Sequence, residues 1–161
     1  MKVILVNGSP HERGCTDRAL REVAAALESE GVQTEMLWTG RQPVSGCTGC
    51  GACRKLKKCV IDGDGVNDFI RKAQSADGFV FGSPVHYASA GGAMTSFLDR
   101  AFYSGGAAMK YKPGAAVVSC RRAGASATFD MLNKYFTINC MPVASANYWS
   151  AERGQPAVDG G

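Results

Sequence analysis

The sequence predicts an α/β protein built on a doubly wound, five-stranded parallel sheet. Short apolar runs alternate along the chain with stretches in which apolar residues recur at i, i+3, i+4 and i+7, and small or polar residues follow the strand ends. Alternating strands and helices require right-handed crossovers, which place helices on both faces of the sheet. The 161 residues contain no interior linker and suffice for one domain.

Five apolar runs predict the strands. The first, VILV at residues 3–6, is unbroken, as is typical of a strand that is covered on both faces. The other strands are expected at residues 32–38, 78–82, 115–119 and 141–146. Helical spacing indicates helices between them, at residues 15–27, 66–73, 94–101 and 129–136, with Asp64 as the cap of the second.

The end of the chain shows no helical periodicity. We expect residues 1–149 to form the domain and residues 150–161 to form an irregular tail. A sheet of this class normally has a last helix on one face, and that helix is apparently missing here. We expect either a continuation of the chain or a partner subunit to cover that face.

Composition excludes several classes of function. The net charge is +4 and the basic residues are scattered, apart from a group at residues 54–58, so no nucleic-acid surface is predicted. No segment is long enough to span a membrane, and the first apolar run ends at Asn7 without a signal cleavage site. Seven cysteines in a chain of this kind indicate a reducing compartment, so we expect a cytoplasmic protein.

Three loops follow strand ends, at residues 7–16, 83–92 and 119–126. In open α/β sheets, ligands bind outside the carboxyl ends of the strands. The first loop leads into a helix, whose free N–H groups and dipole favour a phosphate. Neither G-x-x-x-x-G-K-[ST] nor a G-x-G-x-x-G after the first strand is present, so the common nucleotide motifs are excluded. The loops therefore predict a mononucleotide with a flat ring.

A long irregular segment, residues 39–63, carries a cluster of cysteines. Loops of this length in compact domains are usually functional. The spacing C-x2-C-x2-C-x5-C is formed by Cys47, Cys50, Cys53 and Cys59. Four thiolates so close in sequence can bind one inorganic centre, and the glycines between them allow the turns. Zinc is an alternative metal, although its pairs of cysteines are usually further apart, and a loop without metal is a third possibility.

Three segments, GSPHERGCT, SPVHYASAGGAMTSFLDRA and MPVASANYW, resemble the flavodoxin-like NADPH-dependent FMN reductases. This superfamily includes the multimeric-flavodoxin quinone reductases and the iron–sulfur flavoproteins, and the resemblance covers nearly the whole chain. It implies a flavodoxin-like sheet with strand order 2-1-3-4-5 and FMN at the strand ends. It also implies a [4Fe-4S] cluster, because the cysteine spacing resembles the compact cluster motif of the iron–sulfur flavoproteins.

The resemblance assigns residues of all three loops to FMN. The phosphate would be held by Ser9, Arg13, Cys15 and Thr16, where Cys15 departs mildly from the usual hydroxyl residue. The isoalloxazine ring would lie along Pro84, Val85, His86, Tyr87 and Ala88. Its other edge would be flanked by Ser119, Arg122 and Gly124. His86 and Tyr87 are the expected proton or orientation partners, and the alternative is that they are ordinary loop residues without a ligand.

The predicted function is an FMN-dependent oxidoreductase. It would pass electrons from NAD(P)H or a ferredoxin-like protein donor to a quinone or similar small-molecule acceptor, in a homodimer or homotetramer. A non-catalytic electron carrier is the alternative, against which the isoelectric point of about 8.7 counts, because such flavodoxins are usually acidic. A metal-stabilised interaction module without flavin is a further alternative. Cys15 and Arg21 also match the C-x5-R of low-molecular-weight tyrosine phosphatases, but the residues between them are expected to be helical.

Overall fold

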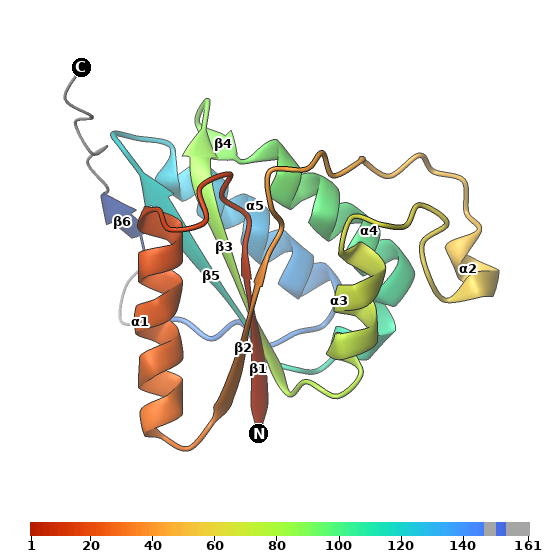
Figure 1. The fold of residues 1–161 in the computed structure, drawn as a ribbon, viewed down its shortest axis with the longest axis horizontal. Coiled ribbons are helices and arrows are strands. Elements are labelled where there is room, and N and C mark those ends of the chain that lie inside the picture. Colours follow the sequence, from red (N-terminus) through yellow and green to blue (C-terminus); the bar gives the residue numbers. More distant parts are fainter. Residues whose placement is uncertain (147–150, 154–161) are drawn as a thin grey trace.

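The computed structural model describes residues 1–146 and 151–153, and a parallel sheet forms its centre (Figure 1). The parallel strands are β1 (Lys2–Asn7), β2 (Gln33–Trp38), β3 (Gly78–His86), β5 (Gly114–Cys120) and β6 (Ala151–Arg153). They pair in the order β2-β1-β3-β5-β6, and the short β4 (Ser89–Ala90) pairs antiparallel with β3. Counted along the chain, the parallel strands have the order 2-1-3-4-5, which confirms the predicted flavodoxin-like fold.

Helices cover the two faces of the sheet unequally (Figure 1). On one face, α1 (Cys15–Ser29) packs Leu20 against Leu5, Val80 and Val117. On the other face, α3 (Val66–Ala73), α4 (Gly92–Met109) and α5 (Ala125–Ile138) enclose the larger core. Among the described residues, α1 is the only helix on its face, which agrees with the prediction that a covering helix is lacking there.

A group of phenylalanine rings binds α3 and α4 to the sheet. Phe69 of α3 lies 5.9 Å and 6.0 Å from the ring centroids of Phe79 and Phe81 of β3. It lies 5.2 Å from the ring centroid of Phe97 on α4. Edge-to-face pairs of this kind add about 0.5–1.5 kcal/mol each beyond the burial of their surface. The phenylalanine cluster therefore fixes α3 against α4. These two helices contact the cysteine segment, residues 39–63. No helix in the described ranges is long and apolar enough to cross a membrane.

The last strand begins later than predicted. The prediction of a strand at residues 141–146 is wrong, because this run forms only an isolated bridge between Val143 and Gly114, at the start of β5. The backbone of Gly114 bonds there to Pro142 at 2.9 Å and to Ala144 at 2.8 Å. Since β6 pairs in parallel with residues 118–120 of β5, the apolar run and β6 lie along the same edge of that strand. The strand β6 lies beyond residue 149, the predicted end of the domain.

One carboxylate links the edge strand β2 to its neighbours. Glu35 lies 2.6 Å from Lys2 Nζ of β1 and 2.7 Å from Lys72 Nζ of α3. Hydrogen bonds from Lys2 and Lys72 lower the pKa of Glu35. A carboxyl group with a lowered pKa stabilises the folded state above its unfolded pKa, and this contribution is lost as the pH falls through the folded pKa.

We therefore expect Glu35→Gln to lower the free energy of unfolding by about 1 kcal/mol or less at pH 7. The effect should vanish at a pH below the folded pKa, where Glu35 is protonated in both states. Urea denaturation at the two pH values measures this difference. Glu22→Gln is the control, because its pair with Arg18 is more exposed. An equal loss at both pH values would show that the charge of Glu35 is not what stabilises the fold.

Candidate functional site

The three predicted loops lie next to one another, because they follow the adjacent strands β1, β3 and β5 (Figure 1). The first loop is bound to the middle of β3 through Gly8 N, which donates to Gly82 O at 2.9 Å. The same loop is bound to the end of β5 through Thr16 Oγ1 and Ser119 Oγ, which lie 2.7 Å apart and are buried. One continuous edge thus contains predicted residues from elements that are far apart in the sequence.

Local hydrogen bonds fix the shape of the first loop. Asn7 Oδ1 accepts a bond from Ser9 N at 3.0 Å, and Ser9 Oγ accepts one from His11 N at 3.1 Å. Such side-chain turns are a common use of Asn and Ser in loops. From the end of β2, Trp38 Nε1 donates to Ser9 O at 2.8 Å. The loop therefore enters α1 in a defined conformation, with the first N–H groups of the helix at the strand end.

The four residues predicted to hold phosphate fall into two pairs. Ser9 and Thr16 are buried in the loop and in the first turn of α1, whereas Arg13 and Cys15 are exposed. The buried pair provides hydroxyl groups close to the N–H groups of the helix start. The exposed pair lies on the solvent side of the same loop.

The phosphatase interpretation does not fit the structure. Cys15 is the first residue of α1, so the whole stretch up to Arg21 is helical. Arg21 Nε pairs with Asp17 Oδ2 at 2.7 Å, instead of returning to the loop as a phosphatase arginine must. This pairing also offsets the negative charge of Asp17 close to the predicted anion site.

The second loop is shorter than predicted, because β3 continues to His86. A two-residue turn, Tyr87 and Ala88, then leads into β4, and both residues have positive φ, 51° and 62°. This geometry suits Asn and Gly, and for other residues it costs on the order of 1–2 kcal/mol each. The Tyr87 side chain is fully exposed. Backbone strain of this kind clusters at functional sites, which supports a role for this hairpin beyond stability.

The predicted ring-binding residues line this hairpin. Pro84 and Val85 are half-buried on β3, and His86, Tyr87 and Ala88 are exposed. The third loop packs directly on them at Gly124, which has a φ of 88°.

A Cβ atom at Gly124 would lie 2.6 Å from Ala88 Cα and 2.9 Å from Val85 Cγ1. Only glycine fits this contact, which brings the second and third loops together. Arg122, in the same loop, is exposed.

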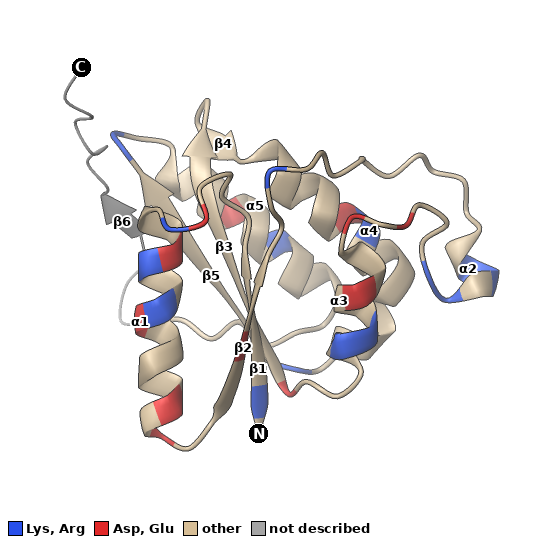
Figure 2. Cartoon of the chain, in the orientation of Figure 1, with Lys and Arg blue, Asp and Glu red and all other residues tan. Residues whose placement is uncertain are grey.

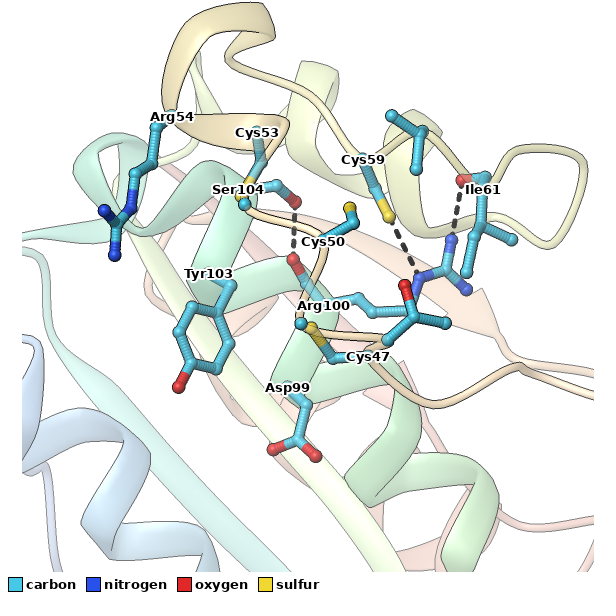
Figure 3. A pocket seen from close by; sticks show the side chains of 14 residues that line it. Cys47, Cys50, Cys53, Arg54, Cys59, Ile61, Asp99, Arg100, Tyr103 and Ser104 are labelled. Carbon is cyan, nitrogen blue, oxygen red and sulfur yellow. Dashed lines mark hydrogen bonds between the residues drawn. The ribbon is translucent and has the colours of Figure 1, made fainter.

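The four cysteines lie around one cavity of about 610 Å³ between the cysteine segment and α4 (Figure 3). Cys53 is the first residue of α2 (Cys53–Leu56), a short helix that lies away from the sheet (Figure 1). Basic residues gather on this helix (Figure 2). Gly49 and Gly51 have φ values of 67° and 70°, which lets the chain turn between the cysteines. From α4, the cavity is lined by Asp99, Arg100, Tyr103 and Ser104.

Arg100 fastens both ends of the cysteine segment to α4. Its side chain is fully buried and ion-pairs with Asp64. It donates to Ser45 O at 3.2 Å and to Ile61 O at 2.7 Å, and its Nε donates to Cys59 Sγ at 3.2 Å (Figure 3). Burial alone lowers the pKa of Arg100, but the bonds to Asp64 and Cys59 outweigh this and raise it. The guanidinium therefore remains charged at the wall of the cavity.

Cys59 is held by a second helix through its backbone. Cys59 N donates to Asn67 Oδ1 of α3 at 2.9 Å, and Asn67 Nδ2 donates to Cys59 O at 3.0 Å and to Ile61 O at 3.3 Å. Because α3 and α4 are joined through the phenylalanine cluster, Cys59 is the firmly positioned member of the four.

The chemistry and spread of the thiols decide which metal centre they fit. In the described part of the chain, no three Cys, His, Asp or Glu side chains converge closely enough to bind one metal ion. A single Zn²⁺ needs its sulfur ligands about 2.3 Å away, all around one point. A polynuclear iron–sulfur cluster spans several atoms and takes thiolates that are further apart. Four soft thiol ligands around one cavity, with the Arg100 cation beside them, suit either zinc or an iron–sulfur cluster.

Sequence reasoning missed three residues that organise these sites: Trp38, Asn67 and Arg100. Trp38 and Asn67 carry no distinguishing pattern. Arg100 does carry a weak one, because Asp99 and Arg100 are the only charged residues of the 18-residue helix α4. Such an isolated charge in an apolar helix often has a buried partner.

The fold defines a flavodoxin-like protein in which the three predicted loops meet at the carboxyl edge of the sheet. Residues 1–155 match the family model of the NADPH-dependent FMN reductases, and the chain belongs to this family. An iron-sulfur flavoprotein of Methanocaldococcus jannaschii is 32% identical over 98% of this chain and 83% of that protein.

Two solved structures confirm the fold. RosB with a bound 8-demethyl-8-formylriboflavin-5′-phosphate has a TM-score of 0.74 and 15% identity, over 98% of this chain and 67% of RosB. A flavodoxin from the domain Archaea has a TM-score of 0.65 and 16% identity, over 97% of this chain and 87% of the flavodoxin.

Proposed function

We propose that the chain binds FMN where the three loops meet, and passes electrons from NAD(P)H or a protein donor to a quinone or similar acceptor. The observation that carries this proposal is the contact between the loops: Thr16 meets Ser119, and Gly124 meets Ala88. These contacts bring residues of three separate loops together, which supports a single ligand at this place. Membership of the FMN reductase family supports the choice of FMN among flat mononucleotides.

In this proposal, the first loop binds the phosphate. Ser9, Thr16 and the N–H groups at the start of α1 supply the donors, and the exposed Arg13 and Cys15 lie at the solvent side. Thr16 Oγ1 already meets Ser119 Oγ at 2.7 Å, so these two hydroxyls share one hydrogen and leave a further donor for an anion. The positive end of the α1 dipole adds to the attraction.

The second and third loops hold the ring. Its flat face lies along residues 84–88, and Ser119, Arg122 and Gly124 flank the other edge. When bound, FMN supplies both two-electron and one-electron transfer. The chain orients the ring and stabilises its charge, through N–H donors and the exposed His86, which can hold or release a proton near the ring. Tyr87 is the second orientation partner.

We further propose that Cys47, Cys50, Cys53 and Cys59 bind a [4Fe-4S] cluster. The four thiols line one cavity, and the buried Arg100 places a positive charge against it. The iron-sulfur flavoprotein name of the M. jannaschii relative supports this proposal. A cluster here would let the protein exchange single electrons with a ferredoxin-like partner.

Denaturation of the protein should release FMN, and the refolded apoprotein should take up FMN. Thr16→Val should weaken FMN binding about tenfold to a hundredfold, because a hydrogen bond to a charged group contributes about 1.5–3 kcal/mol. Quenching of flavin fluorescence measures the affinity. Thr128→Val, in the first turn of α5, is a matched control, because the buried Thr128 Oγ1 has no hydrogen-bond partner in the structure as described.

A colourless protein that will not take up added FMN would overturn the central proposal. Oxidation of NAD(P)H with a quinone acceptor tests the reductase activity separately. Bound FMN without turnover would indicate the carrier function instead.

A further inference from the structure

The buried Arg100 of α4 lines the cysteine cavity, and its guanidinium lies beside Cys59 and Ile61 (Figure 3). Arg54 lines the same cavity, but it is exposed to solvent on α2. Arg100 Nε donates to Cys59 Sγ at 3.2 Å. The side chain is 1% exposed, so its charge is shielded little by water.

The donor atom cannot easily turn away from the sulfur. The two terminal nitrogens of Arg100 are bound to Ser45 O, Ile61 O and Asp64, which fixes the plane of the guanidinium. On the other side, Asn67 holds the backbone of Cys59. Donor and acceptor are therefore both held in place, the acceptor by Asn67 of α3 and the donor by Asp64 and the backbone at Ser45 and Ile61.

We propose that Arg100 is a positioning residue that sets the reduction potential of the centre bound by the four cysteines, through its hydrogen bond to Cys59 Sγ. This inference rests on the proposed cluster. Uptake of one electron adds one negative charge to the cluster and its thiolates, and no bond is broken. An N–H donor and a positive charge at one thiolate stabilise the reduced form more than the oxidised form, which raises the potential.

Asp64 moderates this effect. Its carboxylate is paired with Arg100 and is only slightly exposed, so it offsets part of the positive charge of Arg100 at the wall of the cavity. Removal of the Arg100 donor should lower the potential. Removal of the Asp64 charge should raise it, because the guanidinium is then less neutralised. Opposite shifts from two neighbouring substitutions are not expected from a general disturbance of the loop.

The test is a redox titration of the anaerobically purified protein, with dithionite as reductant and electron paramagnetic resonance as readout. Loss of Arg100 alone leaves the Asp64 carboxylate unpaired, so the main variant combines Arg100→Gln with Asp64→Asn. We expect it to shift the reduction equilibrium about tenfold or more, or about 59 mV, to more negative potential. Arg100→Lys, which keeps the charge but lacks the Nε donor, should shift it in the same direction. Asp64→Asn alone should shift it to more positive potential.

Arg54→Gln is the matched control, and its exposed position predicts a much smaller shift. If the parent protein holds no iron and no sulfide, the proposed cluster and this inference both fail. If the cluster is present and its potential is the same in the parent, the double variant and Arg100→Lys, only this inference fails. Equal shifts in Arg100→Lys and Arg54→Gln would also overturn it, because they would show that the effect is not specific to the hydrogen bond between Arg100 and Cys59.

Discussion

Replacement of Gly124 by alanine is expected to lower the free energy of unfolding by about 2–5 kcal/mol and to abolish FMN binding. The backbone of Gly124 has a φ of 88°, which costs a residue with a Cβ about 1–2 kcal/mol. The Cβ would also lie 2.6 Å from Ala88 Cα, a backbone atom that cannot rotate away, and overpacking adds about 1–3 kcal/mol. Urea denaturation and titration with FMN measure the two losses.

Gly63→Ala separates strain from overpacking. Gly63 has a φ of 84°, but no atom lies within 4 Å of the Cβ position. It should therefore lose only the backbone contribution, about 1–2 kcal/mol, and retain FMN. If the Gly124 and Gly63 variants lost the same stability, the contact between the second and third loops would not contribute to the fold.

Replacement of Cys50 by serine is expected to remove all iron and leave FMN binding nearly unchanged. A hydroxyl is a poor ligand for iron–sulfur clusters, and three thiolates hold such a cluster weakly. Cys50 lies in the cysteine segment, outside the three loops assigned to FMN. Iron and sulfide analysis of anaerobically purified protein, together with its visible spectrum, measures both outcomes.

Cys140→Ser is the matched control, because Cys140 is an exposed free cysteine at the end of α5 and does not line the cavity. It should keep the iron content of the parent. Iron that persists in the Cys50 variant would show that the cavity is not the metal site.

The alternation of apolar runs with helical spacing was enough to predict a parallel sheet and the three loops, whereas the strand order came from the family resemblance. The boundaries were harder, because β3 continues past its apolar run. Ser83 and Pro84 still pair with Val118 and Ser119 of β5, although neither is a typical strand residue. Conversely, the run at residues 141–146 looks like a strand but forms only a bridge. Pairing partners, rather than composition, decide such cases.

The sequence identified the residue types at the candidate sites, but it did not identify the residues that hold them in position. Cysteine spacing predicted that the four thiols can bind one inorganic centre. It could not predict that Arg100 binds Asp64, because a buried ion pair between residues 36 positions apart leaves no periodic pattern. The prediction of Asp64 as the helix cap is wrong, because α3 is capped by Gly65, without a side-chain cap bond. Asp64 Oδ1 does lie 3.5 Å from Val66 N, but its stronger partner is Arg100.

The bonds from Arg100 to Ser45 O and Ile61 O also have a consequence for loop entropy. They hold the chain together just before the first cysteine and just after the last, so the cysteine segment is a loop that is already closed. The entropic cost of bringing the ends of a flexible loop together grows with its length. Here the entropic cost of closing the loop is part of the free energy of folding, because Arg100 closes the loop as the protein folds. The free energy with which the thiols bind an inorganic centre is therefore available for affinity, and residues between Cys53 and Cys59 can vary in number without reopening the loop.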